Sequence, residues 1–209
     1  MNYVARMILT KDLAAKQKLF GVYDWHKAAW ELFPDMPNAD REFLFRLDES
    51  EEEFQLTVAS KHKPRHSPWC PEDDWLCYQI PPEYFNRQQY LFMLRVNPTR
   101  TTRKNLDETR REKKHGRHEA VLKMPELREW FIKKSGQCGF RALDQPKLDI
   151  SPPVFHRLEK DGYNGTIIGV DFKGALEVTN RELFKTAFEN GIGRARSFGF
   201  GLLILKPIQ

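Results

Sequence analysis

The sequence has few cysteines and no long apolar run. Only three cysteines occur in 209 residues, a small and odd number that argues against a disulfide scaffold and fits a reducing cytoplasm. No apolar stretch reaches the roughly 18 residues that a membrane helix requires, and the mean hydropathy is −0.64. Charged residues also come too early at the N-terminus for a secretory signal. We therefore expect a cytoplasmic protein with no membrane partner.

Acidic residues are scarce in one stretch in the middle of the chain. From Arg95 to His118 there are nine Lys or Arg residues and only three Asp or Glu residues. This segment alone accounts for the whole net charge of +5. Like charges at this density repel one another unless a partner neutralises them, which favours binding of a polyanion over the alternative, a solvated loop.

The first half of the chain alternates strand and helix signals. Aromatic residues make up 12% of the sequence, which is enough to build a core. A helical pattern over 18–33 ends at Pro34, since the residue before a proline avoids the α region. Alternating or β-rich runs predict strands at 3–9, 43–47, 54–58 and 89–96. This order suits a ferredoxin-like unit whose second helix is short or degenerate.

The second half also mixes strands with two helices. A helix is expected over 125–134, and a second one follows Thr179, where Glu182 completes a capping-box pattern. Extended segments are expected at 147–156, 163–172, 175–178 and 201–206, with a turn at 173–174. The pattern predicts an α+β protein made of two similar halves. We place their limits at 1–97 and 123–209, with a basic connecting segment at 98–122.

A glycine-rich stretch, GIGRARSFGFG, occupies residues 191–201. It is not a dinucleotide fingerprint, because Arg196 stands where G-x-G-x-x-G requires its last glycine, and it lacks the Gly-Lys-Ser/Thr of a P-loop. Two readings stay open: a plain turn, or a turn whose amides and arginines hold nucleic-acid phosphates.

Three chemically suggestive side chains share one face of the first helix. His26 and Lys27 follow Tyr23 by three and four residues, the spacings that place helical side chains on one face. RNA can be cleaved without a metal when a base takes the 2′-hydroxyl proton, an acid protonates the leaving 5′-oxygen and a cation steadies the phosphorane. Histidine suits proton transfer because its unperturbed pKa is near 6.5. The alternative is a structural histidine next to Trp25 and Trp30.

A zinc site is not expected. His62, His66, Cys70 and Cys77 lack the short Cys-x2-4-Cys spacing of common structural sites, and prolines interrupt the segment. We therefore assign no metal and no cofactor to this chain.

Four stretches together resemble the CasE family, the CRISPR-associated endoribonucleases of type I-E systems. They are YDWHK at 23–27, LRVNP at 94–98, GFR at 139–141 and the glycine-rich stretch with the leucines that follow it. The resemblance runs nearly end to end. It implies two tandem ferredoxin-like (RRM-like) domains with antiparallel sheets.

The resemblance also implies an activity and partners. Members of this family cleave CRISPR precursor RNA at the 3′ base of each repeat hairpin without a metal. The 2′-hydroxyl attacks the adjacent phosphate, leaving a 2′,3′-cyclic phosphate and a 5′-hydroxyl. The protein then stays on the hairpin as a subunit of the antiviral Cascade complex. A catalytically inactive module that only binds the hairpin is the alternative. A true RRM protein is disfavoured by the absence of the RNP signature.

Site residues follow from the resemblance position by position. His26 is the expected general acid or base and Tyr23 assists it, although the two roles are not assigned between them. A phosphate-stabilising role for Lys27 is our own addition. The residues expected to bind RNA are Arg95, Asn97, Arg100, Arg103, Lys104, Arg141, Arg157, Lys160, Arg194, Arg196 and Ser197. Among them, Arg157 and Lys160 fall in a hairpin that Leu158 and Glu159 make less basic than the family's.

Overall fold

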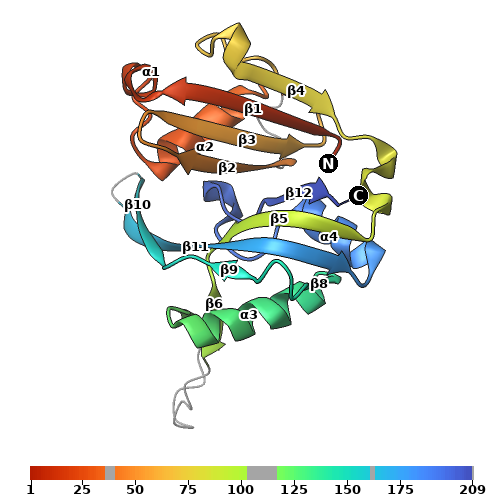
Figure 1. Cartoon of the computed structure of the whole chain (residues 1–209). Coiled ribbons are helices and arrows are strands. Elements are labelled where there is room, and N and C mark those ends of the chain that lie inside the picture. The colour runs from red at the N-terminus through yellow and green to blue at the C-terminus, as the bar shows by residue number, and fades with distance from the viewer. Residues whose placement is uncertain (36–40, 103–116, 161–162, 209) are drawn as a thin grey trace, which may run out of the picture.

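The computed structural model describes residues 1–35, 41–102, 117–160 and 163–208. Two antiparallel sheets lie one above the other (Figure 1). The first contains β1 (Tyr3–Thr10), β2 (Phe43–Glu49), β3 (Glu53–Ser60) and β4 (Trp75–Gln79) in the order β2-β3-β1-β4. Helix α2 (Val22–Glu31) connects β1 to β2. This is the ferredoxin-like strand order, with a loop and a short turn, η1 (Glu72–Asp74), in place of the second helix.

The second sheet repeats this arrangement. Its main strands, in the order β10-β11-β5-β12, are β10 (Val154–Lys160), β11 (Tyr163–Val178), β5 (Gln89–Val96) and β12 (Leu203–Pro207). Helix α3 (Met124–Gln137) follows β5, and α4 (Arg181–Asn190) connects β11 to β12. Short strands β8 (Phe140–Ala142) and β9 (Asp149–Ile150) add to β11. The expected α+β fold with two ferredoxin-like units is confirmed.

One strand belongs to a different sheet from the one we expected. The strand at 89–96 does not complete the first sheet: as β5 it pairs with β11 and β12. The fourth strand of the first sheet is β4, whose Gln79 pairs with Tyr3 of β1. The alternation of β5 correctly predicts a strand, but its partners depend on which faces meet. Phe92 stacks on Phe131 of α3 at 5.7 Å, which places β5 in the second core.

Several local boundaries also differ from the sequence prediction. The helix expected from residue 18 begins only at Val22, because Lys18 takes a left-handed φ of 57° and Gly21 caps α2. A short helix, α1 (Lys11–Lys16), was not predicted. The N-cap of α4 is Asn180, whose side chain accepts from the Leu183 amide at 3.0 Å, and not Thr179. No turn occurs at 173–174, since β11 continues through these residues.

The basic segment is structured at both ends. Strands β6 (Thr99–Thr102) and β7 (Arg117–Ala120) form an antiparallel pair, where a loop or short helix was expected. The expected RNA-binding residues Arg103 and Lys104 lie outside the described residues.

The core positions α2 so that one side of it stays available. Trp25, Ala28, Ala29 and Leu32 are buried against the first sheet, and each large apolar side chain that is fully buried contributes about 1.5–3 kcal/mol. Leu44 and Ala59 of the first sheet also join the core of the second unit. The two sheets therefore share packed residues. No helix within the described ranges is long and apolar enough to cross a membrane.

Candidate active site

The outer face of α2 brings together the three residues singled out from the sequence. The rings of Tyr23 and His26 are stacked, with centroids 5.9 Å apart and an interplanar angle of 18°. The Nζ atom of Lys27 lies 5.1 Å from the centroid of the Tyr23 ring and 3.0 Å from Asp24 Oδ1. A phenol, an imidazole and an ammonium group thus lie within one helical turn.

Asp24 stabilises the first turn of this helix. Its Oδ2 accepts a hydrogen bond from the Gly21 amide at 3.1 Å. Partial burial alone would raise the pKa of Asp24, but the hydrogen bonds from Lys27 and the Gly21 amide outweigh it and lower the pKa. The carboxylate therefore stays ionised and holds Lys27 beside Tyr23. It also suits the positive end of the helix dipole.

His26 is oriented by a residue far away in the sequence. Its Nδ1 lies 2.7 Å from the main-chain oxygen of Ser197. A carbonyl oxygen only accepts, so Nδ1 carries the proton, and in the neutral imidazole Nε2 is the basic nitrogen. Phe198 and Trp30 flank the ring, with centroids 5.8 Å and 6.5 Å away. The orientation and tautomer of His26 are thus set by the glycine-rich stretch.

The glycine-rich stretch has an unusual backbone that presents the Ser197 carbonyl. Ala195 (φ 59°) and Gly199 (φ 86°) flank a single turn, η3 (Arg196–Phe198). The left-handed region favours glycine, and a Cβ at Gly199 would lie 3.0 Å from the Phe45 ring. The stretch is also tied to β5, because the Gly201 amide donates to the Arg95 carbonyl at 2.7 Å. Asn97 forms an isolated bridge with Arg194.

A partly buried charge cluster connects β2, β5 and β11. The Arg95 guanidinium donates to both carboxylate oxygens of Asp171, at 2.9 and 3.1 Å, and to Asp48 at 3.2 Å. It also donates to the Leu47 carbonyl. Arg46, which is 1% exposed, pairs with the same two carboxylates at 2.7 and 3.1 Å. The Arg95 guanidinium is therefore already hydrogen-bonded to groups of the protein itself, and an RNA contact by Arg95 stays a prediction.

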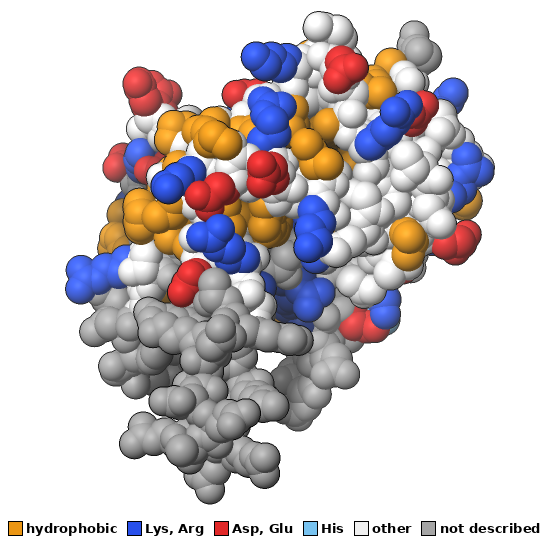
Figure 2. Space-filling model, turned by 90° about the horizontal axis from the view of Figure 1, so that it is seen from below, with side chains coloured by type: hydrophobic (Ala, Val, Ile, Leu, Met, Phe, Trp, Pro, Cys, Tyr) orange, Lys and Arg blue, Asp and Glu red, His pale blue; other side chains and the backbone are white. Residues whose placement is uncertain are grey.

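Other expected RNA-binding residues lie apart from α2. Arg100 on β6 is exposed and pairs with Glu126 of α3 at 3.0 Å. Arg141 on β8 pairs with Glu177 at 2.6 Å. Strand β10, which contacts α2, pairs through His156 with Ile167 of β11. Arg141 pairs with Glu177, ten residues further along β11, which is roughly 30 Å for an extended strand. The face that carries α3 mixes basic, acidic and hydrophobic side chains (Figure 2). Arg141 is therefore not part of the His26 site.

The β10–β11 hairpin lies next to α2. Leu158 is buried in a small cluster with Ile167 and Phe200, against which Tyr23 and Phe198 pack. Strand alternation puts Arg157 on the opposite, exposed face of β10. The side chain of Lys160 lies outside the described residues. The position of Arg157 is compatible with the expected RNA contact, which stays a prediction.

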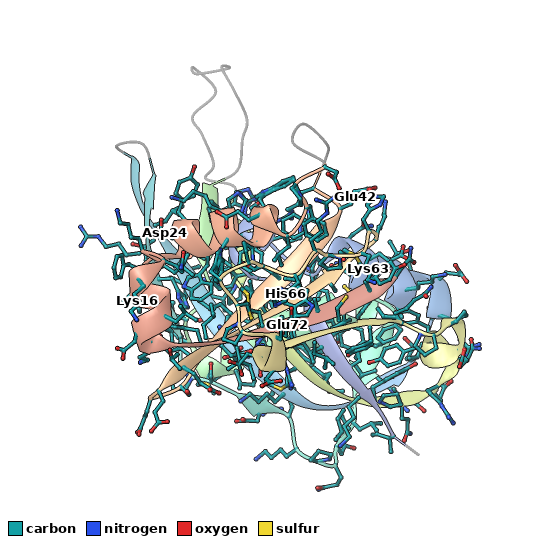
Figure 3. The ribbon with its side chains drawn as sticks, turned by 90° about the horizontal axis from the view of Figure 1, so that it is seen from above. Lys16, Asp24, Glu42, Lys63, His66 and Glu72 are labelled. Carbon is teal, nitrogen blue, oxygen red and sulfur yellow. The ribbon has the colours of Figure 1, made fainter. Side chains whose placement is uncertain are left out.

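The histidines and cysteines of the loop after β3 do not converge. His62 pairs with Glu42 at 2.7 Å, and His66 Nδ1 lies 3.9 Å from Glu72 (Figure 3). Cys70 is buried, and burial raises its pKa to about 11. Within the described residues, no group of three or more His, Cys, Asp or Glu side chains is arranged to hold a metal.

Three residues near the site had no signal in the sequence. Asp48 and Asp171, the partners of Arg95, belong to strands far apart in the chain. Arg41 lies directly before β2, next to Phe43. Asp48 and Asp171 meet Arg95 only once β2, β5 and β11 are assembled, so local patterns could not indicate them.

Comparison with known proteins gives one consistent family. The profile of the "CRISPR associated protein" family matches residues 2–207. The chain is 28% identical to the CRISPR system Cascade subunit CasE of Escherichia coli K12, over 97% of this chain and all of that protein. It is 26% identical to the CRISPR-associated endoribonuclease Cse3 of Thermus thermophilus, over 93% of this chain and 94% of the relative.

The fold agrees with that family as well. A solved structure of CRISPR endoribonuclease Cse3 bound to a 19-nucleotide RNA superposes with a TM-score of 0.74, covering 99% of this chain and 100% of the other at 22% identity. The match therefore spans both ferredoxin-like units and the candidate site between them. From the sequence profile, the relatives and the shared fold, the chain belongs to the family of CRISPR-associated proteins that includes CasE and Cse3.

Proposed function

We propose that this protein is an endoribonuclease that cleaves CRISPR precursor RNA at the 3′ base of the repeat hairpin and then remains on the product as a Cascade subunit. The relatives are named as a Cascade subunit and as an endoribonuclease, and a structural neighbour is bound to RNA. The observation that carries the proposal is the His26 imidazole, stacked on Tyr23 with its Nδ1 proton donated to the Ser197 carbonyl.

The chemistry requires one proton to leave the substrate and one to be returned. The 2′-oxygen loses its proton and bonds to the adjacent phosphorus, the bond from phosphorus to the 5′-oxygen breaks, and that oxygen gains a proton. Neutral His26 can accept a proton at Nε2, and protonated His26 can donate one from it. In the protonated state the Ser197 carbonyl also stabilises the imidazolium through Nδ1–H. Tyr23 then assists His26, either by positioning it or by transferring the other proton.

Lys27 supplies positive charge beside these two groups. Its ammonium group contacts the Tyr23 ring and the Asp24 carboxylate. Because its side chain is 56% exposed, the ammonium group can turn toward a phosphate that approaches α2. A cation placed near the scissile phosphate stabilises the extra negative charge of the phosphorane.

Recognition of the hairpin would rely on its shape and its phosphates. The deep, narrow major groove of an A-form stem hides the base edges from most side chains. Exposed arginines on either side of α2, Arg157 on β10 and Arg194 and Arg196 in the glycine-rich stretch, suit such contacts. We expect the remaining RNA-binding residues to extend the surface along the basic segment, with binding that weakens as salt rises.

The decisive experiment uses the purified protein, its own repeat RNA and EDTA. The expected products are a 5′-hydroxyl and a 2′,3′-cyclic phosphate, identified by end-group analysis. His26→Ala should lower the single-turnover cleavage rate by about 10²–10⁴-fold and leave hairpin affinity within about twofold. Undiminished cutting by this variant would refute the catalytic assignment. Binding without cutting by the unmodified protein would favour the inactive hairpin-binding module.

A further inference from the structure

Five arginines of the described residues pair with a carboxylate within 3.2 Å; they are Arg46, Arg65, Arg95, Arg100 and Arg141. Arg41, Arg194 and Arg196 are not among them, and Arg194 contacts His118 at 2.9 Å instead. Arg41 stands two residues before β2 and Arg196 begins η3, and β2 and η3 are in contact with each other.

Among the described residues, Arg41 has no carboxylate partner for its charge. Its guanidinium lies 6.0 Å from the centroid of the Phe43 ring, and its Nη1 is buried with no hydrogen-bond partner. A buried donor without a partner costs about 1–3 kcal/mol, and more when it is charged. The neighbouring carboxylate does not relieve this, since Glu42 pairs with Lys61 at 2.6 Å and His62 at 2.7 Å.

Arg196 brings a second positive charge to the same place. A Cβ at Gly191 would lie 3.1 Å from Arg196 Cδ and 3.0 Å from Leu44 Cδ1, so the Arg196 side chain lies close to β2. Its Nη1 donates to the Asn190 carbonyl at 2.5 Å. The two positive charges repel each other. Burial lowers the pKa of Arg41, and the charge of Arg196 lowers it further. Two guanidinium groups that repel each other, one of them with an unused donor, form a site that an anion would complete.

We propose that Arg41 and Arg196 bind one phosphate of the RNA backbone, on the Trp30 side of the phosphate on which His26 acts. The phosphate would accept from the Arg41 guanidinium and neutralise the repulsion between the two guanidinium groups. Arginine suits this role because its planar fork matches two phosphate oxygens at once. The inference rests on the proposed function, since it takes the ligand to be the RNA that His26 cleaves.

The position of this phosphate subsite relative to His26 follows from a row of aromatic contacts. The Phe43 ring meets Trp30 edge-on at 5.0 Å, and Trp30 meets His26 edge-on at 6.5 Å. Arg41 therefore lies on the Trp30 side of His26, while Tyr23 and Lys27 lie on the other. Asp24 marks the start of α2 and Glu42, the residue after Arg41, lies beyond its other end (Figure 3). The RNA backbone would pass along α2 over His26.

The test measures binding of the full-length protein to a repeat RNA with a 2′-deoxy nucleotide before the scissile phosphate, so that no cleavage occurs. Arg41→Ala and Arg196→Ala should each weaken binding about tenfold and reduce the slope of log affinity against log salt by about 1. The double variant should lose little more than either single one, because both arginines hold the same phosphate. Arg41→Lys should recover part of the affinity.

A matched control separates this site from a general loss of charge. Arg65→Ala also removes one arginine, but that side chain pairs with Asp35 at 2.5 Å, so the RNA affinity and salt slope should not change. Single methylphosphonates, which remove the charge of one phosphate at a time, locate the contact. One position near the cleavage site should weaken binding to the unmodified protein about tenfold and have no effect on Arg41→Ala.

The outcomes are distinguishable from a failure of the proposed function. If the unmodified protein neither binds nor cuts the repeat hairpin, the proposed function fails. If it does both and Arg41→Ala matches Arg65→Ala at every salt concentration, the phosphate subsite is wrong and the function stands. Equal methylphosphonate effects on the unmodified protein and Arg41→Ala at every position would also overturn the subsite. Each effect is a ratio measured on one protein, so a difference in stability between the two proteins does not alter the comparison.

Discussion

His26 and Ser197 are 171 residues apart in sequence, yet the imidazole Nδ1 of one lies 2.7 Å from the main-chain oxygen of the other. The histidine belongs to the first ferredoxin-like unit and the carbonyl to the second. The reactive nitrogen is therefore correctly presented only when the two units are packed together. The glycine-rich stretch, which would ordinarily be assigned to phosphate binding, therefore also positions His26 through a main-chain carbonyl.

This contact predicts that Gly199→Ala impairs cleavage more than binding. Gly199 has a φ of 86°, and a Cβ would lie 3.0 Å from Phe45, so the turn that holds the Ser197 carbonyl must shift. We expect the single-turnover rate to fall at least tenfold, since an error of about 1 Å in placing a catalytic group can cost a hundredfold. The affinity for the uncleavable hairpin should fall by a smaller factor than the rate, because Arg196 belongs to the same turn but the RNA-binding residues on other elements are unaffected.

The matched control is Gly136→Ala, a glycine near the end of α3 where an added Cβ would have no atom within 4 Å. Alanine favours the helix over glycine by up to about 1 kcal/mol, so this variant should be as stable as the unmodified protein or more so, with the same cleavage rate. Equal rates for both glycine variants would show that the Ser197 carbonyl does not position His26.

The charge cluster predicts a second outcome, for Arg95. Without Arg95, the partly buried carboxylates of Asp48 and Asp171 share the Arg46 guanidinium, and the lost hydrogen bonds cost about 1–3 kcal/mol. Arg95→Ala should therefore lower the free energy of unfolding by about that amount, measured in urea, and leave the salt dependence of RNA binding unchanged. A flatter salt slope at full stability would instead support the RNA contact expected from the sequence.

Asp171 gives the same cluster a pH dependence. Burial alone would raise its pKa, but Arg95 and Arg46 outweigh this and hold the pKa below its ordinary value of 3.8. A carboxyl group whose pKa is lower in the folded state stabilises the fold above the unfolded pKa, and this stabilisation is lost as the pH falls through the folded value. The urea midpoint should fall below about pH 4, and Asp171→Asn should reduce that loss while lowering stability at pH 7.

Local patterns predicted much of this molecule, and long-range pairing explains the rest. The shared face of Tyr23, His26 and Lys27 depends only on helical spacing, so the sequence was sufficient to find it. The partners of Arg95 were not predictable, because Asp48 and Asp171 reach it only once β2, β5 and β11 are assembled.

The strand at 89–96 illustrates the same limit. Its alternating pattern identifies a strand, but hydrophobic alternation carries no information about which sheet will cover it. The preference of Phe92 for the core with Phe131 decides that β5 joins the second sheet. For the same reason, a serine carbonyl that orients a histidine leaves no trace in the sequence, since every residue has a carbonyl.

The basic segment gives the last prediction. Replacing Arg100, Arg103 and Lys104 by alanine should weaken repeat binding and reduce its salt slope, because each lost phosphate contact removes roughly 0.7–0.9 from that slope. Arg100 should contribute least of the three, since its guanidinium already pairs with Glu126 at 3.0 Å and must leave that carboxylate to reach a phosphate. Arg100→Ala alone should therefore have a smaller effect than Arg103→Ala.

The charge-matched control replaces Lys16, Lys185 and Lys206, which are exposed on other elements. If both triple variants lose affinity equally, the segment acts only through the overall charge of the protein and makes no direct phosphate contacts.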